Sequence, residues 1–177
     1  MLAFSSCKKS TSAPSIVGTW VFTNFSGVDS LNDPPQTQGQ VSIYSYNSTT
    51  NILTASTSDS VHTTPRTSSI IVTSETWTFN VDGKYIINET YAVPGYPSQT
   101  SVDTGTWVYA GNTQSDTVFI LTGSPSSVFQ FINPTVTSTG IYTYHTAGNT
   151  MTLSDVQTLV YSAEYVDSVN IAITFKK

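Results

Sequence analysis

Few residues of this chain are of the types that perform catalytic chemistry. The 177-residue sequence contains two histidines, His62 and His145, and one cysteine, Cys7. His62 lies in the segment SVHTTPRT, and His145 lies on the strand face opposite Tyr142 and Tyr144. Acid–base and nucleophilic catalysis need such groups placed beside one another. The sequence therefore predicts two isolated histidines and a protein that binds and does not catalyse.

Motifs for phosphate or metal binding are absent from the sequence. It has no glycine-rich phosphate loop, no HExxH motif and no paired-cysteine zinc motif. The segment DSLND at 29–33 supplies oxygen ligands, but it lacks the spacing and the terminal glutamate of a calcium loop. We therefore expect no metal and no cofactor.

One β-hairpin has a register that the sequence can decide. The segment ETWTFNVDGKYIINETY contains Asp82-Gly83 at its centre. A two-residue type I′ turn would pair Val81 with Lys84, whereas a type I turn followed by a left-handed Gly83 pairs Asn80 with Lys84. Only the second register gathers the large apolar side chains on one face, so it is the predicted one. These side chains are Trp77, Phe79, Tyr85 and Ile87.

The same register places two acidic residues together. Glu75 lies opposite Glu89, on the face that carries Trp77. Like charges directly opposite each other destabilise a sheet, and two carboxylates beside apolar side chains can raise each other's pKa or hold a cation. Our interpretation is that the hairpin frays here, with both carboxylates at a solvated barrel rim.

The amino-acid composition of the chain limits the classes of protein to which it can belong. Charged residues make up 10% of the chain, aromatic residues make up 12%, and the net charge is −5. Low charge with many β-branched and aromatic residues is typical of strands with one solvated face. Four of the six basic residues lie near the ends, which argues against the basic patch of a nucleic-acid binder. No apolar run reaches the roughly 18 residues of a membrane helix.

Short alternating segments predict an all-β fold. The clearest is VNIAITF at 169–175, and segments such as GNTQSD at 111–116 and AGN at 147–149 mark turns. Short strands at this spacing indicate an antiparallel barrel, with a β-sandwich as the alternative. The predicted strands are 16–25, 40–46, 51–58, 68–80, 84–93, 102–110, 116–122, 127–132, 139–146, 156–165 and 169–175.

The tripeptide Gly-Thr-Trp occurs twice, at Gly18–Trp20 and at Gly105–Trp107. Glycine allows another part of the chain to approach closely at a strand start. Threonine then faces outward, and tryptophan turns inward to fill the end of a barrel. The residues after the two copies do not align, so we expect strands that return to the same barrel end and not a duplication.

A family resemblance supports the barrel. Gly18–Trp20 matches the G-x-W that opens the first strand of lipocalins. The segments IVGTWVFT, TWTFNVDGKY and GTWVYAGN, then DTVFIL, resemble lipocalin-like lipoproteins of Bacteroidetes-type bacteria in that order. The resemblance implies a lipocalin-like antiparallel β-barrel of about eight to ten strands over 16–177, with a lid loop at 26–39. The lipocalin arginine that packs over the first tryptophan has no counterpart, because the only arginine is Arg66.

The first residues, MLAFSSCKKSTSAPS, resemble the lipobox end of a bacterial lipoprotein signal. In that family the residue matching Cys7 is lipidated and becomes the mature N-terminus. Most of the charged and apolar parts of a complete signal are missing. The resemblance implies a signal remnant and flexible tether over 1–15 and a lipid anchor in the outer membrane. The anchored protein would lie on the cell surface or on the periplasmic face, and Lys8 and Lys9 favour the periplasmic face. The alternative is an ordinary tail with a free thiol.

These observations predict a monomeric, non-enzymatic cell-envelope lipoprotein that binds a small apolar or amphipathic molecule inside its barrel. Two alternatives stay open. In the first, the inward side chains only form the core, because eight-stranded barrels can be filled by side chains. In the second, the outer face of the barrel is an adhesion module that binds glycan or protein. The predicted lining residues are Trp20, Phe22, Trp77, Phe79, Tyr85, Ile87, Trp107 and Tyr109.

Overall fold

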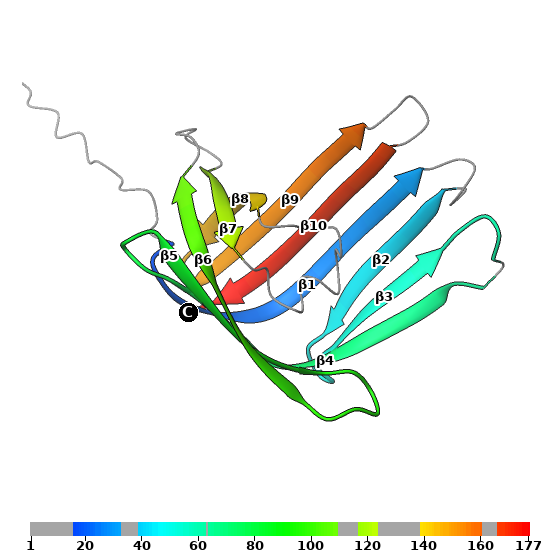
Figure 1. Cartoon of the computed structure of the whole chain (residues 1–177), viewed down its shortest axis with the longest axis horizontal. Helices are drawn as coiled ribbons and strands as arrows, with labels where there is room; N and C mark the ends of the chain where they lie inside the picture. Colours follow the sequence, from blue (N-terminus) through cyan, green and yellow to red (C-terminus); the bar gives the residue numbers. More distant parts are fainter. Residues whose placement is uncertain (1–15, 33–38, 63, 110–116, 124–138, 161–165) are drawn as a thin grey trace, which may run out of the picture.

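The computed structural model describes residues 16–32, 39–62, 64–109, 117–123, 139–160 and 166–177. Ten strands in these ranges form a closed antiparallel barrel in the order β1-β10-β9-β8-β7-β6-β5-β4-β3-β2 (Figure 1). The fold is therefore the predicted all-β barrel, and the β-sandwich alternative is wrong. The strands are β1 (Gly18–Asn32), β2 (Gln40–Asn47), β3 (Ile52–Ser58), β4 (Arg66–Phe79), β5 (Lys84–Ala92), β6 (Gln99–Tyr109), β7 (Thr117–Gly123), β8 (Thr139–Ala147), β9 (Thr150–Val160) and β10 (Val166–Lys176).

Alternation of apolar and polar residues gives the strands a buried and an exposed face. In β10, Ile171, Ile173 and Phe175 are buried, whereas Asn170 between two inward residues is exposed. The interior of the barrel is one apolar cluster to which most strands contribute. Burial of this inward face is the main favourable contribution to folding.

The barrel wall broadens from one end to the other. From Gly18 to Val21, β1 pairs directly with β4. From Ser26 onward β1 pairs with β2, and β3 pairs with the first half of β4. Figure 1 shows β2 and β3 lying between β1 and β4. We call the end where β1 meets β4 the narrow end and the opposite end the wide end, because barrel diameter grows with strand number.

The turn between β2 and β3 lies where β1 and β4 separate. The main-chain nitrogen of Val72 donates a hydrogen bond to the oxygen of Asn51 at 2.8 Å. Asn51 has a left-handed φ of 56°, which asparagine tolerates better than most residues. The register of β4 shifts between Val72 and Ser74, as in a β-bulge. A bulge bends its strand, and it lies where β4 changes partners from β1 to β3.

The β4–β5 hairpin has the predicted register. Phe79 pairs with Tyr85. The nitrogen of Asn80 donates to the oxygen of Lys84 at 2.8 Å, and the nitrogen of Gly83 donates to the oxygen of Asn80 at 3.2 Å. Gly83 has a φ of 79°, which is the left-handed conformation. The bulged turn and the face assignment that depends on it are therefore confirmed.

Replacement of Gly83 by valine tests this turn. We expect Gly83→Val to lower the free energy of unfolding by about 1–2 kcal/mol, because a residue with a Cβ is strained at positive φ. The added Cβ would also lie 3.3 Å from the main-chain oxygen of Trp107. Gly83→Asn is the matched control, since asparagine tolerates this conformation. Equal losses in the two variants, measured by urea unfolding, would contradict the account.

Both Gly-Thr-Trp tryptophans are buried near the narrow end, as predicted. The Trp20 Nε1 donates to the main-chain oxygen of Ile16 at 2.7 Å. The Trp107 Nε1 donates to the main-chain oxygen of Lys84 at 3.1 Å. Each ring thus buries its apolar body while its one polar atom is hydrogen bonded.

A cation covers the first tryptophan after all. The Lys177 Nζ lies 4.5 Å from the centroid of the Trp20 ring, and it donates to the main-chain oxygen of Val17 at 3.3 Å. Lipocalins place an arginine over the first tryptophan; in this chain a lysine of the last residues takes that place, which the family pattern did not predict. A Cβ on Gly18 would lie 3.3 Å from the Lys177 side chain, so the glycine makes room for it.

Two expectations about the chain course are wrong, and others fall on residues that the structure does not describe. The lid loop at 26–39 is wrong over 26–32, because these residues continue β1 with partners in both β2 and β10. Residues 33–38 lie outside the described residues, as do 1–15 with Cys7 and the strand predicted at 127–132. The strand predicted at 156–165 begins earlier, at Thr150, because β8 and β9 join through a tight turn at Gly148.

Candidate functional site

Seven of the eight predicted lining residues are buried together in the barrel. Phe79 is central to this group: its ring centroid lies 6.1 Å from that of Trp77, 6.4 Å from that of Tyr85 and 6.0 Å from that of Trp107. The side chain of the eighth residue, Tyr109, lies outside the described part. These rings fill the narrow end, and their contact with a ligand stays a prediction. The buried seven are Trp20, Phe22, Trp77, Phe79, Tyr85, Ile87 and Trp107.

Among the residues that the structure describes, three acidic side chains are buried in the barrel. Glu75 is 3% exposed, Glu89 is 1% exposed and Asp155 is 5% exposed. Glu75 and Glu89 face each other on β4 and β5, as predicted. Their expected place at a solvated rim is wrong. The hairpin does not fray there, because pairing continues past them to Ile71 and Ala92.

Hydrogen bonds hold these carboxylates in apolar surroundings. The Trp77 Nε1 donates to Glu75 Oε1 at 2.6 Å. The Ser101 hydroxyl donates to Glu89 Oε1 at 2.5 Å, and its oxygen lies 3.5 Å from Asp103 Oδ2. Hydrogen bonds to a charged acceptor are short and strong, and they offset part of the cost of burying a carboxylate.

Two buried tyrosines, Tyr85 and Tyr142, interact electrostatically with acidic groups of the barrel interior. Burial and then the charge of Asp103 raise the pKa of Tyr85 to about 12. Burial and then the charge of Asp155 raise the pKa of Tyr142, with Tyr85 as a further contributor. Both phenols are therefore protonated at neutral pH, so each keeps an O–H donor inside the barrel.

We call this set of interior polar residues the polar band. The described lysine and arginine side chains are all exposed, so none of them lies among the acidic groups of the band. Its carboxylates accept hydrogen bonds, its phenols donate them, and aromatic rings lie beside both. The polar band consists of Glu75, Glu89, Ser101, Asp103, Asp155, Tyr85 and Tyr142.

Sequence reasoning singled out Glu75, Glu89 and Tyr85 of the polar band and left out the other members. Ser101 and Asp103 share the strand parity of Trp107, and Asp155 shares that of Leu153. Side chains two residues apart point to the same face of a strand. This parity was a usable signal that the two strands carry inward polar residues.

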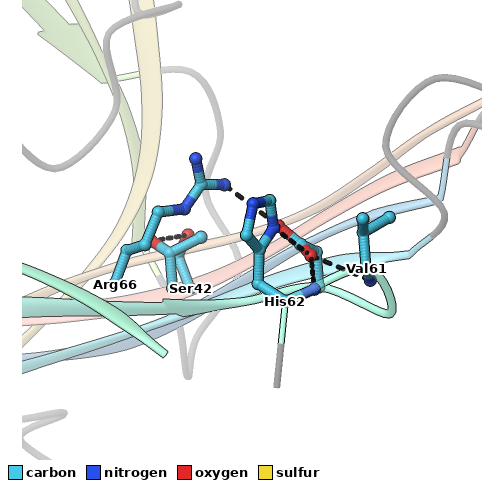
Figure 2. Close-up of polar contacts among 6 residues, drawn as sticks. Ser42, Val61, His62 and Arg66 are labelled. Carbon is cyan, nitrogen blue, oxygen red and sulfur yellow. Dashed lines mark hydrogen bonds and ion pairs between the residues drawn. The ribbon is translucent and has the colours of Figure 1, made fainter. Parts of the chain in front are cut away.

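His62 belongs to a surface cluster in the β3–β4 connection (Figure 2). The Asp59 carboxylate accepts hydrogen bonds from the main-chain nitrogens of Val61 at 3.0 Å and His62 at 2.7 Å. Its Oδ1 lies 2.7 Å from His62 Nδ1, and its Oδ2 accepts from Arg66 Nη2 at 3.0 Å. The hydrogen bond from the His62 side chain is the main cause that lowers the pKa of Asp59. The prediction that His62 is isolated is therefore wrong.

His145 is exposed on β8, on the face opposite the buried Tyr142 and Tyr144, as the alternation predicted. Within the described ranges, no group of three or more His, Cys, Asp or Glu side chains is placed to hold a metal ion. The same ranges contain no helix of the length and apolarity needed to cross a membrane.

Comparison with known proteins identifies no relative. Protein-family models, curated proteins and solved structures were each searched, and none of them matches this chain.

Proposed function

We propose that this chain is a non-enzymatic, lipid-anchored protein of the bacterial cell envelope that holds a small amphipathic molecule inside its barrel. The observation that supports this function best is the polar band inside a closed barrel whose described buried residues are mostly apolar. Ligand sites are typically concave and mostly apolar, with a few polar groups that fix the orientation of the ligand. In this proposal the aromatic side chains of the narrow end form the floor of the site.

The buried carboxylates favour a binding role over a purely structural one. Burying a charge is costly even when it is hydrogen bonded, and apolar replacements of buried charged groups are often neutral or stabilising. Glu75, Glu89 and Asp155 thus lower the stability that an apolar interior would have. Asp103 lies beside them with a pKa that burial and then the charge of Glu89 raise, and an interior acid with a shifted pKa is a candidate for a functional site.

The chemistry of the polar band indicates the polar part of the ligand. Carboxylates only accept hydrogen bonds when ionised, and the neighbouring aromatic rings attract positive charge. A ligand with an N–H donor or a cationic nitrogen next to an apolar body suits this arrangement.

Binding is tested by titrating the protein with N-phenyl-1-naphthylamine, an uncharged fluorophore with an N–H group and an apolar body. We expect a saturable rise in emission, and we expect Glu75→Gln and Glu89→Gln to change its affinity. The control is Asp82→Asn, because Asp82 is 55% exposed on the β4–β5 turn. A linear, non-saturable response in the wild-type protein would refute interior binding.

The lipid anchor rests on Cys7 and its flanking residues, which lie outside the described part. When it is expressed with a full lipoprotein signal sequence in a Bacteroidetes host, the protein should partition into the detergent phase. Cys7→Ser should move it to the aqueous phase, because no thiol is then available for lipid attachment. Ser12→Ala in the tether is the control and should stay with the detergent. If wild type and Cys7→Ser both stay aqueous, there is no anchor.

Adhesion through the outer face is the second candidate function. Val28 and Ile43 lie directly opposite each other on β1 and β2, and their side chains are 43% and 54% exposed. Exposed apolar side chains that adjoin one another are suited to an interface. If Ile43→Asp loses glycan binding while its binding of N-phenyl-1-naphthylamine is unchanged, adhesion is favoured over ligand binding inside the barrel.

A further inference from the structure

Ser101 lies between two carboxylates but has a single proton to donate. Its oxygen is 2.5 Å from Glu89 Oε1 and 3.5 Å from Asp103 Oδ2. A serine hydroxyl has one O–H donor and two acceptor lone pairs. It donates to one carboxylate at a time, and the shorter distance assigns its proton to Glu89. Asp103 therefore faces the oxygen of Ser101 and not its hydrogen.

A contact between a carboxyl oxygen and a hydroxyl oxygen is favourable when one of them supplies a proton. We propose that Asp103 carries a proton in the folded protein and donates it to Ser101. The result is a directed chain of hydrogen bonds from Asp103 through Ser101 to Glu89. Because Asp103 must keep its proton to donate it, the stability of this part of the barrel depends on pH. This inference does not depend on the proposed ligand.

The strand register keeps the three groups together. On β5 and β6, Glu89 pairs with Ser101, and Ile87 pairs with Asp103. The Asp103 side chain is half-buried on the inward face, next to Glu89, which is almost fully buried. Burial raises the pKa of Asp103, and the charge of Glu89 raises it further; only a hydrogen bond donated by Ser101 to the carboxylate would act in the opposite direction.

The described ionisable groups around Asp103 are acidic or phenolic. On β5, Glu89 and Tyr85 interact with it electrostatically. On β4, Glu75 lies opposite Glu89. Farther across the barrel, Tyr142 of β8 couples Tyr85 to Asp155 of β9. Ionisation of Asp103 thus adds a negative charge to neutral and negative neighbours.

The sign of the pH dependence follows from the raised pKa of Asp103. An acid that binds its proton more tightly in the folded state stabilises the fold less as pH rises from the ordinary value of 3.8 through the folded pKa. Asp59 has a lowered pKa, so its contribution is present above 3.8 and is lost below that value. The two carboxyl groups therefore act in separate pH windows.

Carbon-13 NMR of the Asp103 carboxyl group in the full chain tests the inference directly. We expect its titration midpoint to lie clearly above 3.8. In parallel, urea unfolding is measured from about pH 4 to pH 8 for wild type and Asp103→Asn. The wild-type folding constant should fall by up to about tenfold per pH unit in the window where Asp103 titrates, which is the limit for one proton. Asp103→Asn should lose this fall, because its amide donates to Ser101 without titrating.

Asp82→Asn is the matched control, because it removes one aspartate charge from an exposed turn and should keep the wild-type pH dependence. A carboxyl midpoint at or below 3.8 would overturn the inference, as would a wild-type slope in Asp103→Asn. If Asp103→Asn does not fold, the titration midpoint of the Asp103 carboxyl group in the wild-type protein decides whether the inference holds. Ser101→Ala gives a second readout: it removes the acceptor of the Asp103 proton, so the titration midpoint of Asp103 should move downward. An upward move would show that Ser101 donates its hydrogen bond to the Asp103 carboxylate, and it would overturn the inference.

Discussion

Trp77→Ala is expected to lower the free energy of unfolding by about 3–5 kcal/mol, the range for truncating a large buried aromatic side chain. Trp77 is 2% exposed, and its ring centroid lies 5.2 Å from that of Phe175. Its backbone pairs with Trp20 of β1 on one side and Ile87 of β5 on the other. The cavity would therefore open where the two strands that close the narrow end meet.

Trp77→Phe separates packing from hydrogen bonding at this position. Phenylalanine keeps an aromatic ring but removes the Nε1 donor that lies 2.6 Å from Glu75 Oε1. Loss of one bond to a buried charged acceptor should cost about 1–3 kcal/mol. Urea unfolding of both variants gives the comparison. A loss below about 1 kcal/mol in Trp77→Ala would contradict the packed narrow end.

Phe79→Ala is expected to cost a similar amount, about 3–5 kcal/mol, because Phe79 is 1% exposed and contacts three other rings. Trp77 precedes it on β4, Tyr85 pairs with it on β5, and Trp107 packs edge-on from β6. No small movement of one neighbour would fill the space that the ring leaves.

The same variant distinguishes a residue of the core from one that also lines a ligand site. If Phe79 lies under a bound molecule, the affinity for N-phenyl-1-naphthylamine should fall by about 1–3 kcal/mol through lost apolar contact. Val108→Ala is the control, because Val108 is exposed on the outer face of β6. A loss of stability with unchanged affinity would make Phe79 core alone. An unchanged stability would contradict the packing described here.

The pattern of apolar and polar residues was sufficient to predict the register of the β4–β5 hairpin. It was not sufficient to predict how far β1 extends. One register of the β4–β5 hairpin buries a single face, so pattern alone decided it. The loop expected at 26–39 came from the family resemblance and not from the residues of the segment. In the structure a Cβ on Gly27 would lie 2.6 Å from the Ile171 side chain, so the glycine fits a close contact between β1 and β10. That reason depends on a strand far away in the sequence.

The burial of Glu75 and Glu89 was missed for a similar reason. The register placed them opposite each other, but their hydrogen-bond donors could not be read from it. One donor is the indole of Trp77 on the same strand, and the other is Ser101 on β6. Without donors, two facing glutamates suggest a solvated rim. Barrel closure, which brings Asp155 of β9 to the same interior, is a property of the whole sheet.

Native mass spectrometry of the protein purified from its host tests the central claim most directly. If the barrel holds a small amphipathic molecule, the spectrum should contain a non-covalent adduct that is released on collisional activation. The adduct should weaken in Glu75→Gln or Glu89→Gln and persist in Asp82→Asn. A spectrum with the bare protein mass alone, together with no saturable uptake of N-phenyl-1-naphthylamine, would contradict the proposed carrier function.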